Sequence, residues 1–293
     1  MLRALLPRRR GRRPVVDSGP PIDPPPGRVV NLPGRGEVFV RDSAGGGPAV
    51  LLLHGWMVSA DINWLLSYQA LSDAGYRVIA LDHRGHGRGL RTVDPFRLDA
   101  CADDAAAVVA ALDAAPAIAV GYSMGGPIVQ LLARRHPRLL RGMVLCATTR
   151  EWRGRDYERL WRTMGVVRVV VSLSPFGFWT TLLRVMGMPE QAHAAWLVAE
   201  LGRGAPAALA EAGRELGRFD SRGWLDEVRT PAAVVVTALD RSVPPSKQRA
   251  MAAQLGARTF DVSGDHLVVA EAGSQFNAVL LAALEHVRDA AGP

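Results

Sequence analysis

Hydrophobic residues along this chain of 293 residues fall into two alternating patterns. Short apolar runs without a polar face, such as residues 49–53, are typical of strands that helices cover on both sides. Longer segments with apolar residues three or four positions apart are typical of helices that cover such a sheet. These patterns predict strands at 28–32, 37–41, 49–53, 76–81, 117–120, 141–147, 232–237 and 257–262, and helices at 62–74, 98–112, 128–133, 246–255 and 274–290.

The alternation of strand and helix predicts an α/β fold class. We expect a doubly wound, mostly parallel, eight-stranded sheet that begins with a hairpin, and whose chemistry lies at the carboxyl ends of its strands. The alternation stops after residue 147, where helix-like segments near 151–164, 175–186, 190–202 and 205–217 are broken by Pro and Gly. We therefore predict four regions: a basic, Pro-rich disordered tail over 1–27, a core over 28–147, an inserted helical cap over 148–222, and the rest of the core over 223–293.

The predicted cap contains an unusually apolar stretch. Residues 169–183 carry no charge, but they include Pro175 and Gly177 and are fewer than the ~20 residues that a membrane span needs. We expect this stretch to form the interior of the cap or to line a pocket. The cap also holds four of the seven Trp residues, and two roles remain open for them: packing within the cap, or contact with an apolar ligand.

The charge of the chain is concentrated at its N-terminus. The formal net charge is +7, yet six of the 35 basic residues lie within residues 1–13, so the remainder holds 29 basic against 28 acidic residues. A nearly neutral folded body argues against a nucleic-acid partner. Two interpretations of residues 1–27 stay open: a disordered tail, or a weak electrostatic contact with an anionic membrane surface.

The two cysteines, Cys101 and Cys146, lie in a helical and a strand-like apolar segment. Buried free thiols fit a reducing compartment. No apolar segment of the kind found in secretion signals follows the N-terminal arginines. We therefore expect a cytoplasmic protein, peripheral to the membrane if the basic tail contacts lipid.

The most informative motif is Gly121-Tyr122-Ser123-Met124-Gly125, which joins a predicted strand to a predicted helix. A serine in such a turn adopts a strained backbone conformation, and small residues must stand two positions before and after it. The start of the helix favours negative charge that develops beside the hydroxyl. A nucleophile is therefore favoured over the alternative, a Gly-rich turn with a solvated serine.

Together with four other segments, this motif resembles the α/β-hydrolase fold family, over roughly residues 28–290. The segments are His54-Gly55-Trp56, Asp82-His83-Arg84-Gly85-His86-Gly87, Asp240 after a late strand, and His266 after the last strand. The order Ser, Asp, His is the order used in this fold. One departure is Arg88-Gly89 after the Gly-His-Gly sequence, where the family often has a serine; it leaves the details of that loop open.

Elementary chemistry assigns the roles. The hydroxyl of Ser123 needs a base, and we predict that His266 supplies it because imidazole titrates near neutral pH. Asp240 is predicted to orient His266, and Asp226 is the next best acid. Asp265 is adjacent to the histidine and Asp261 lies on the strand before it, and neighbours in an extended segment should point away from each other.

The predicted oxyanion hole consists of two backbone N–H groups, those of Trp56 and Met124. Because these are main-chain groups, their side chains are free to shape the acyl pocket. The resemblance gives His54 and His86 a role in loop geometry, and His83, His136, His193 and His286 have no matching context.

These residues predict a serine hydrolase that cleaves carboxylic esters or thioesters of hydrophobic acyl substrates through an acyl-enzyme. The same triad serves cofactor-free haloperoxidases or perhydrolases, carbon–carbon bond hydrolases and acyltransferases in the family, so these remain alternatives. A serine rather than an aspartate at position 123 argues against epoxide hydrolysis and dehalogenation. A non-catalytic binding protein on this fold is less favoured, because no triad position is missing. We expect no cofactor and no metal, since no matching motif is present.

Overall fold

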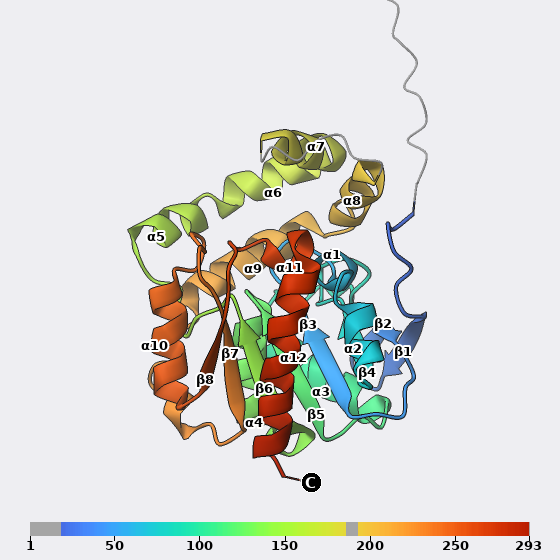
Figure 1. Ribbon diagram of the computed structural model, residues 1–293. Coiled ribbons are helices and arrows are strands. Elements are labelled where there is room, and N and C mark those ends of the chain that lie inside the picture. The colour runs from blue at the N-terminus through green and yellow to red at the C-terminus, as the bar shows by residue number, and fades with distance from the viewer. Residues whose placement is uncertain (1–18, 186–192, 293) are drawn as a thin grey trace, which may run out of the picture.

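In the computed structural model, which describes residues 19–185 and 193–292, eight strands form one sheet flanked by helices (Figure 1). The strand order is β1-β2-β4-β3-β5-β6-β7-β8, with β1 and β2 antiparallel to their neighbours and the others parallel. The predicted fold class is thus confirmed. Of the tail predicted to be disordered over 1–27, residues 1–18 lie outside the described residues. The strands are β1 Gly27–Leu32, β2 Gly36–Asp42, β3 Ala49–Leu53, β4 Arg77–Leu81, β5 Ala117–Tyr122, β6 Leu140–Cys146, β7 Ala232–Thr237 and β8 Arg258–Val262.

Two apolar layers hold the sheet between helices. Along β3, Leu51 and Leu53 face a core that includes the buried side of α3 and α4, while Val50 and Leu52 face a core built with α1, α2 and α12. Alternate residues of one strand thus point into opposite layers, which explains why β3 has no polar position. The α-helices outside the segment between β6 and β7 are α1 Ala60–Trp64, α2 Tyr68–Asp73, α3 Leu98–Ala111, α4 Gly125–Arg135, α10 Pro245–Leu255, α11 Val268–Glu271 and α12 Gly273–Ala290. Short 3-10 turns lie at Pro137–Leu139, before β6, and at Leu225–Glu227, before β7.

The prediction of a single helix over 62–74 is wrong, because the chain forms two short helices there. Ser59 caps α1 through a bond from the Ile62 N–H to its hydroxyl, and α1 ends one turn later. Trp64 and Tyr68, four positions apart, still enter the same core on either side of the break. The short helix α11 was not predicted, since its four residues are too few to show a period.

Among the described residues, five α-helices lie between β6 and β7, above the carboxyl edge of the sheet (Figure 1). Their bounds are α5 Arg155–Arg162, α6 Met164–Leu173, α7 Pro175–Val185, α8 Ala194–Leu201 and α9 Pro206–Arg218. The segment leaves and rejoins the core at one point, where Glu151 and Asp220 form an antiparallel bridge. The first helix begins later than expected because Gly154, with φ of 139°, turns the chain just before it.

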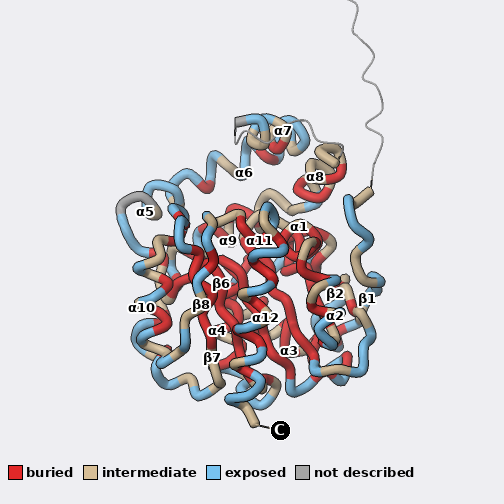
Figure 2. The backbone as a smooth tube through the Cα atoms, in the orientation of Figure 1, coloured by how far each residue is buried: buried red, intermediate tan, exposed pale blue. Residues whose placement is uncertain are grey.

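The expectation that residues 169–183 are interior is wrong for several positions. Trp179 packs against Leu201 and Leu209, as expected of a cap interior. Val169, Val170, Leu173 and Phe176 are instead exposed, and Figure 2 shows much of α6 and α7 in the colours of exposed and half-buried residues. Helix α6 has apolar residues on opposite faces, and the rest of the described protein covers only one of these faces.

Candidate active site

Ser123 occupies a sharp turn between β5 and α4. Its φ is 50°, a left-handed conformation that is unfavourable for a residue with a side chain. The turn requires glycine on both sides: a Cβ on Gly121 would lie 2.4 Å from the Gly125 carbonyl oxygen, and one on Gly125 would lie 2.1 Å from that of Leu53. The turn therefore fixes the Ser123 side chain at the carboxyl edge of β5, where it is 8% exposed.

The loops after β7 and β8 bring Asp240 and His266 to this serine. The His266 Nε2 atom lies 3.0 Å from the Ser123 Oγ atom, and its Nδ1 atom lies 2.7 Å from the Asp240 Oδ2 atom. Because an ionised carboxylate only accepts hydrogen bonds, Nδ1 donates and Nε2 is left to accept the hydroxyl proton. The structure thus brings the three predicted side chains into one hydrogen-bonded chain.

Asp240 is held by four donors. Its Oδ1 atom accepts bonds from the backbone N–H groups of Ser242 and Val243, each at 2.8 Å. Its Oδ2 atom accepts from the Thr237 hydroxyl at 2.8 Å as well as from His266. These donors give both oxygens of the buried side chain hydrogen-bond partners and fix its orientation toward His266.

The other acids considered have different partners. Asp261 binds Arg249 at 2.8 Å on the exposed side of β8, and Asp265 accepts the backbone N–H of Leu267 at 2.8 Å. Asp226 is exposed in the turn before β7. These positions agree with the argument that neighbours of His266 in sequence point away from its ring.

The two predicted oxyanion donors lie on the segments that border Ser123. Met124 follows the serine directly and is buried, and Trp56 lies in the loop after β3. A Cβ on Gly55 would be 3.5 Å from the Ser123 Cβ, so this loop runs directly beside Ser123. Among the hydrogen bonds of residues 19–185 and 193–292, none is donated by the backbone N–H of Trp56 or Met124. Their role as an oxyanion hole stays a prediction.

Two neighbouring residues that the sequence did not single out shape the site. The Tyr122 hydroxyl donates to the His266 carbonyl at 3.0 Å, and its ring packs between Trp64 and Phe276. Burial raises the pKa of the Tyr122 phenol well above its usual range, so it remains a donor. The Thr148 hydroxyl donates to the Ser123 carbonyl at 2.7 Å. Tyrosine in an apolar strand gives no signal of such a contact, which is visible only in three dimensions.

Three buried histidines support the loops beside the site. His54 accepts the His83 backbone N–H at 2.9 Å, and the rings of His54 and His83 lie 4.2 Å apart. Burial lowers the pKa of His54 to about 4 and that of His86 to about 3, and it lowers the pKa of His83 well below its usual range. All three are therefore neutral near pH 7, as a structural role requires.

Arg88, the departure from the family pattern, links the core to the helices above it. Its guanidinium binds the buried Glu200 of α8 at 2.5 Å and Asp61 of α1 at 3.3 Å. Glu200 also accepts from Arg203 at 2.8 Å. A buried carboxylate with two cations fixes α8 in position over the core, because breaking such a pair leaves an uncompensated charge.

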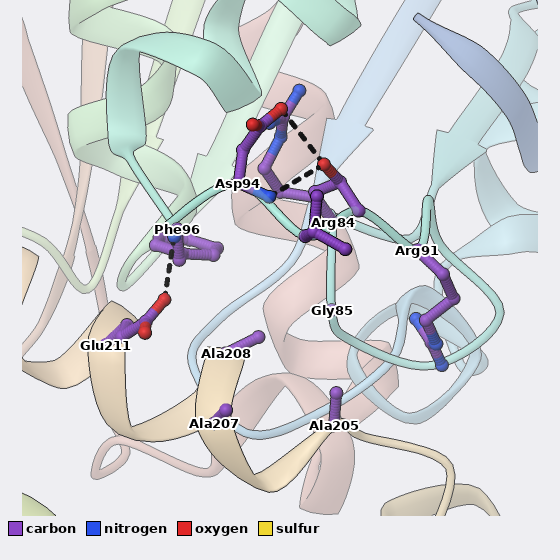
Figure 3. A pocket seen from close by; sticks show the side chains of 11 residues that line it. Arg84, Gly85, Arg91, Asp94, Phe96, Ala205, Ala207, Ala208 and Glu211 are labelled. Carbon is purple, nitrogen blue, oxygen red and sulfur yellow. Dashed lines mark hydrogen bonds between the residues drawn. The ribbon is translucent and has the colours of Figure 1, made fainter.

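A cleft of about 140 Å³ lies beside the site rather than in it (Figure 3). It separates the loop that contains Arg84 and Phe96 from α9, and the Phe96 N–H donates to Glu211 across it at 2.8 Å. Ser123, Asp240 and His266 are not among its lining residues. Among the described residues, no cluster of three or more His, Cys, Asp or Glu side chains is arranged to hold a metal ion.

Known proteins resemble this chain at two levels. A family model described as the alpha/beta hydrolase fold matches residues 48–180. A non-heme haloperoxidase of Rhodococcus erythropolis is 42% identical over 100 residues, which are 34% of this chain and 36% of that protein. A bifunctional esterase/perhydrolase of Acinetobacter calcoaceticus is 37% identical over 102 residues, or 34% of this chain and 37% of that protein. Epoxide hydrolase B of Mycobacterium tuberculosis is 36% identical over 121 residues, covering 40% of this chain and 34% of that protein. The chain thus matches just over a third of the length of these relatives.

Solved structures extend the likeness to the whole fold. Bromoperoxidase from Bacillus anthracis superposes with a TM-score of 0.76 at 19% identity, covering 89% of this chain and all of that one. The nucleophile turn, the order of the strands and the family model define an α/β-hydrolase fold. The chain therefore has the α/β-hydrolase fold, and its residues 48–180 match the family model of that fold.

Proposed function

We propose that this protein is a serine hydrolase that cleaves carboxylic esters or thioesters of hydrophobic acyl substrates. The observation that carries the proposal is the continuous hydrogen-bonded chain from the Ser123 hydroxyl through His266 to Asp240. A serine with an accepting imidazole at 3.0 Å can lose its proton as it attacks a carbonyl, which an isolated hydroxyl does poorly.

In the acylation step, Ser123 Oγ attacks the substrate carbonyl carbon while its proton moves to His266 Nε2. The resulting imidazolium faces the Asp240 carboxylate, which stabilises the positive charge and keeps the ring oriented. The negative oxygen of the tetrahedral intermediate is placed to accept from the backbone N–H groups of Trp56 and Met124. The intermediate collapses when the alcohol or thiol leaves with the proton from Nε2.

Deacylation repeats these steps with water. Nε2, now neutral again, accepts a proton from a water molecule that attacks the acyl carbon, and it returns that proton to Ser123 as the acid departs. Because each step uses the same nitrogen as acceptor and then donor, the imidazole must remain in one tautomer throughout. The bond from Nδ1 to Asp240 enforces that tautomer.

The apolar side chains next to Trp56 support a hydrophobic acyl group. Met57 and Val58, which follow it in the loop, pack on the cluster of Trp179, Leu201 and Leu209 from the helices above. The Trp56 ring itself meets that of Trp161 at 5.6 Å. Aliphatic and aromatic surfaces beside a nucleophile bind acyl chains through the hydrophobic effect.

A second candidate is perhydrolysis, which the esterase/perhydrolase relative and the haloperoxidase relative favour. In this reaction hydrogen peroxide replaces water in the second step, attacks the acyl carbon through one oxygen, and leaves as a peracid while its proton passes through His266. The reactions of the family that use an Asp nucleophile are less favoured than these two candidates, because position 123 is a serine.

The test uses purified full-length protein with p-nitrophenyl esters of increasing acyl length and a fluorophosphonate label. We expect hydrolysis and labelling, both lost in Ser123→Ala. Ser246→Ala, which removes an exposed hydroxyl at the start of α10, is the matched control and should retain both. Labelling that survives in Ser123→Ala would overturn the proposal. Peracid formation from acetate and hydrogen peroxide, measured by bromide oxidation, separates the second candidate from the first.

A further inference from the structure

Helix α6 has an apolar face that no other part of the described chain covers. Val166, Val169, Val170 and Leu173 are exposed and recur at the spacing of one helical face. The opposite face, with Met164 and Val171, is the one buried in the protein. Exposed apolar residues gathered on one face indicate an interaction surface, unlike the single exposed residues of ordinary surfaces.

The exposed face continues around a bend onto α7. Leu173 ends α6 with 81% of its surface exposed, and Phe176 begins α7 with 60% exposed. No single described helix is long and apolar enough to cross a membrane, and the one helix pair that reaches this length and composition is bent by 113° between α6 and α7. We call the exposed residues Val166, Val169, Val170, Leu173 and Phe176 the α6–α7 surface.

The sequence that forms the α6–α7 surface carries charge of one sign. Between residues 159 and 189 the sequence has four arginines and no acidic residue or lysine. Arg162 at the end of α5 and Arg168 in α6 are exposed. An apolar helix face with arginines near it is the pattern of helices that lie in the interface of an anionic membrane.

These observations decide between two occupants. A second copy of the chain bound through a two-fold axis would place this same basic surface against itself, bringing arginines of like charge together. A lipid membrane instead has acyl chains that can contact the apolar residues of the α6–α7 surface and phosphates that can bind the arginines. We propose that the α6–α7 surface docks the protein on an anionic lipid membrane, with Leu173 and Phe176 inserted below the headgroups.

Docking through this face has a geometric consequence. Helices α6 and α7 lie above the carboxyl edge of the sheet, the edge at which Ser123 stands (Figure 1). The protein therefore approaches the lipid with its candidate active site turned toward the membrane. The proposal does not rest on catalysis, since lipid binding can be measured equally well in Ser123→Ala.

The first experiment measures cosedimentation of full-length protein with phosphatidylcholine vesicles, with and without phosphatidylglycerol. We expect stronger binding to the anionic vesicles. Val166→Ser/Val169→Ser should lower the partition coefficient roughly tenfold, because two apolar side chains are lost from the contact. Val29→Ser/Val93→Ser makes the same chemical change at two exposed residues outside this surface and should leave binding unchanged.

A second pair of variants tests the charge. Arg162→Gln/Arg168→Gln should lower binding to the anionic vesicles by about tenfold or more and leave the weak binding to neutral vesicles unchanged. Arg138→Gln/Arg229→Gln is the matched control, since these exposed arginines precede β6 and β7 at the opposite edge of the sheet. Equal losses in both pairs would mean that net charge alone drives binding and would overturn the proposal. Loss of all binding on deletion of residues 1–24 would also overturn it, in favour of the N-terminal arginines.

A site-specific probe gives a readout that does not depend on affinity. Both native cysteines are buried, so Leu173→Cys can be labelled with an environment-sensitive nitrobenzoxadiazole dye. We expect its fluorescence to rise and shift to the blue with anionic vesicles, while the same dye at Val29→Cys stays unchanged. The same shift without vesicles, together with a dimer in analytical ultracentrifugation, would show that a second copy covers the surface and would overturn the proposal.

Discussion

Replacement of Asp240 by asparagine tests the candidate triad with the least change in shape. The Oδ1 position accepts two backbone N–H groups, those of Ser242 and Val243. An asparagine must place its carbonyl oxygen there, because its NH₂ group at that position would face two donors. The NH₂ group therefore takes the Oδ2 position and points at His266 Nδ1.

That orientation of the asparagine changes the tautomer of the His266 imidazole. With an NH₂ donor facing it, Nδ1 becomes an acceptor and the ring proton moves to Nε2, the atom 3.0 Å from Ser123 Oγ. Nε2 can then no longer take the serine proton, and no carboxylate faces the imidazolium. Loss of the correct tautomer in a triad costs roughly 10⁴-fold in kcat. The fold should change little, since the two backbone bonds and the packing remain.

The assay compares kcat/KM for p-nitrophenyl butyrate in Asp240→Asn with that in Asp265→Asn. Asp265 is next to the proposed base in sequence and bonds only to the Leu267 N–H among the described contacts, so its variant should stay within a few-fold of wild type. Thermal unfolding by circular dichroism checks that both are folded. If Asp240→Asn retains a tenth of the activity or more, or both variants lose activity alike, the assignment of Asp240 is wrong.

Three further outcomes follow from the geometry of single residues. Tyr122→Phe removes the hydroxyl that holds the carbonyl of the proposed base, so kcat should fall about tenfold with little change in KM, a split that steady-state kinetics measures. Gly125→Ala sets a Cβ 2.1 Å from the Leu53 carbonyl, and we expect urea titration to show a loss of about 2 kcal/mol or more. The folded-state pKa of His83 is lowered by burial, so its contribution to stability is complete above pH ~6.5 and is lost as pH falls, at up to about 1.4 kcal/mol per pH unit. His83→Leu should therefore flatten the decline in unfolding free energy between pH 6.5 and 5, whereas His286→Leu, at a partly exposed ring, should not.

The central strands were predictable because they are apolar on both faces, and few other structures bury such runs. The mostly parallel order of the sheet follows from the helices between its strands. The break between α1 and α2 was not predictable, because both halves continue one apolar period, with Trp64 and Tyr68 buried in the same core. The exposed face of α6 was missed for a related reason: hydrophobicity predicts a buried face only when something covers it.

The meeting of Ser123, Asp240 and His266 could be inferred because each follows a different parallel strand, and carboxyl ends of such strands share one edge. Contacts that cross the fold without a motif could not be inferred. Tyr122 reaches a carbonyl 144 positions away, and Arg88 reaches Glu200 112 positions away. Neither residue type nor spacing indicates these partners. The oxyanion role of Trp56 and Met124 and the acyl specificity remain predictions for the kinetic tests.

The bridge between Glu151 and Asp220 means that five helices enter and leave the core through one narrow stem. The backbone is joined there a second time, by the Ser221 N–H and the Arg150 carbonyl at 2.9 Å. Side chains also join the segment to the core, as in the ion pair of Arg88 with Glu200. We expect that a segment of different length or polarity, joined at the same two backbone positions and keeping such contacts, would change the choice of substrate and leave Ser123, His266 and Asp240 in place.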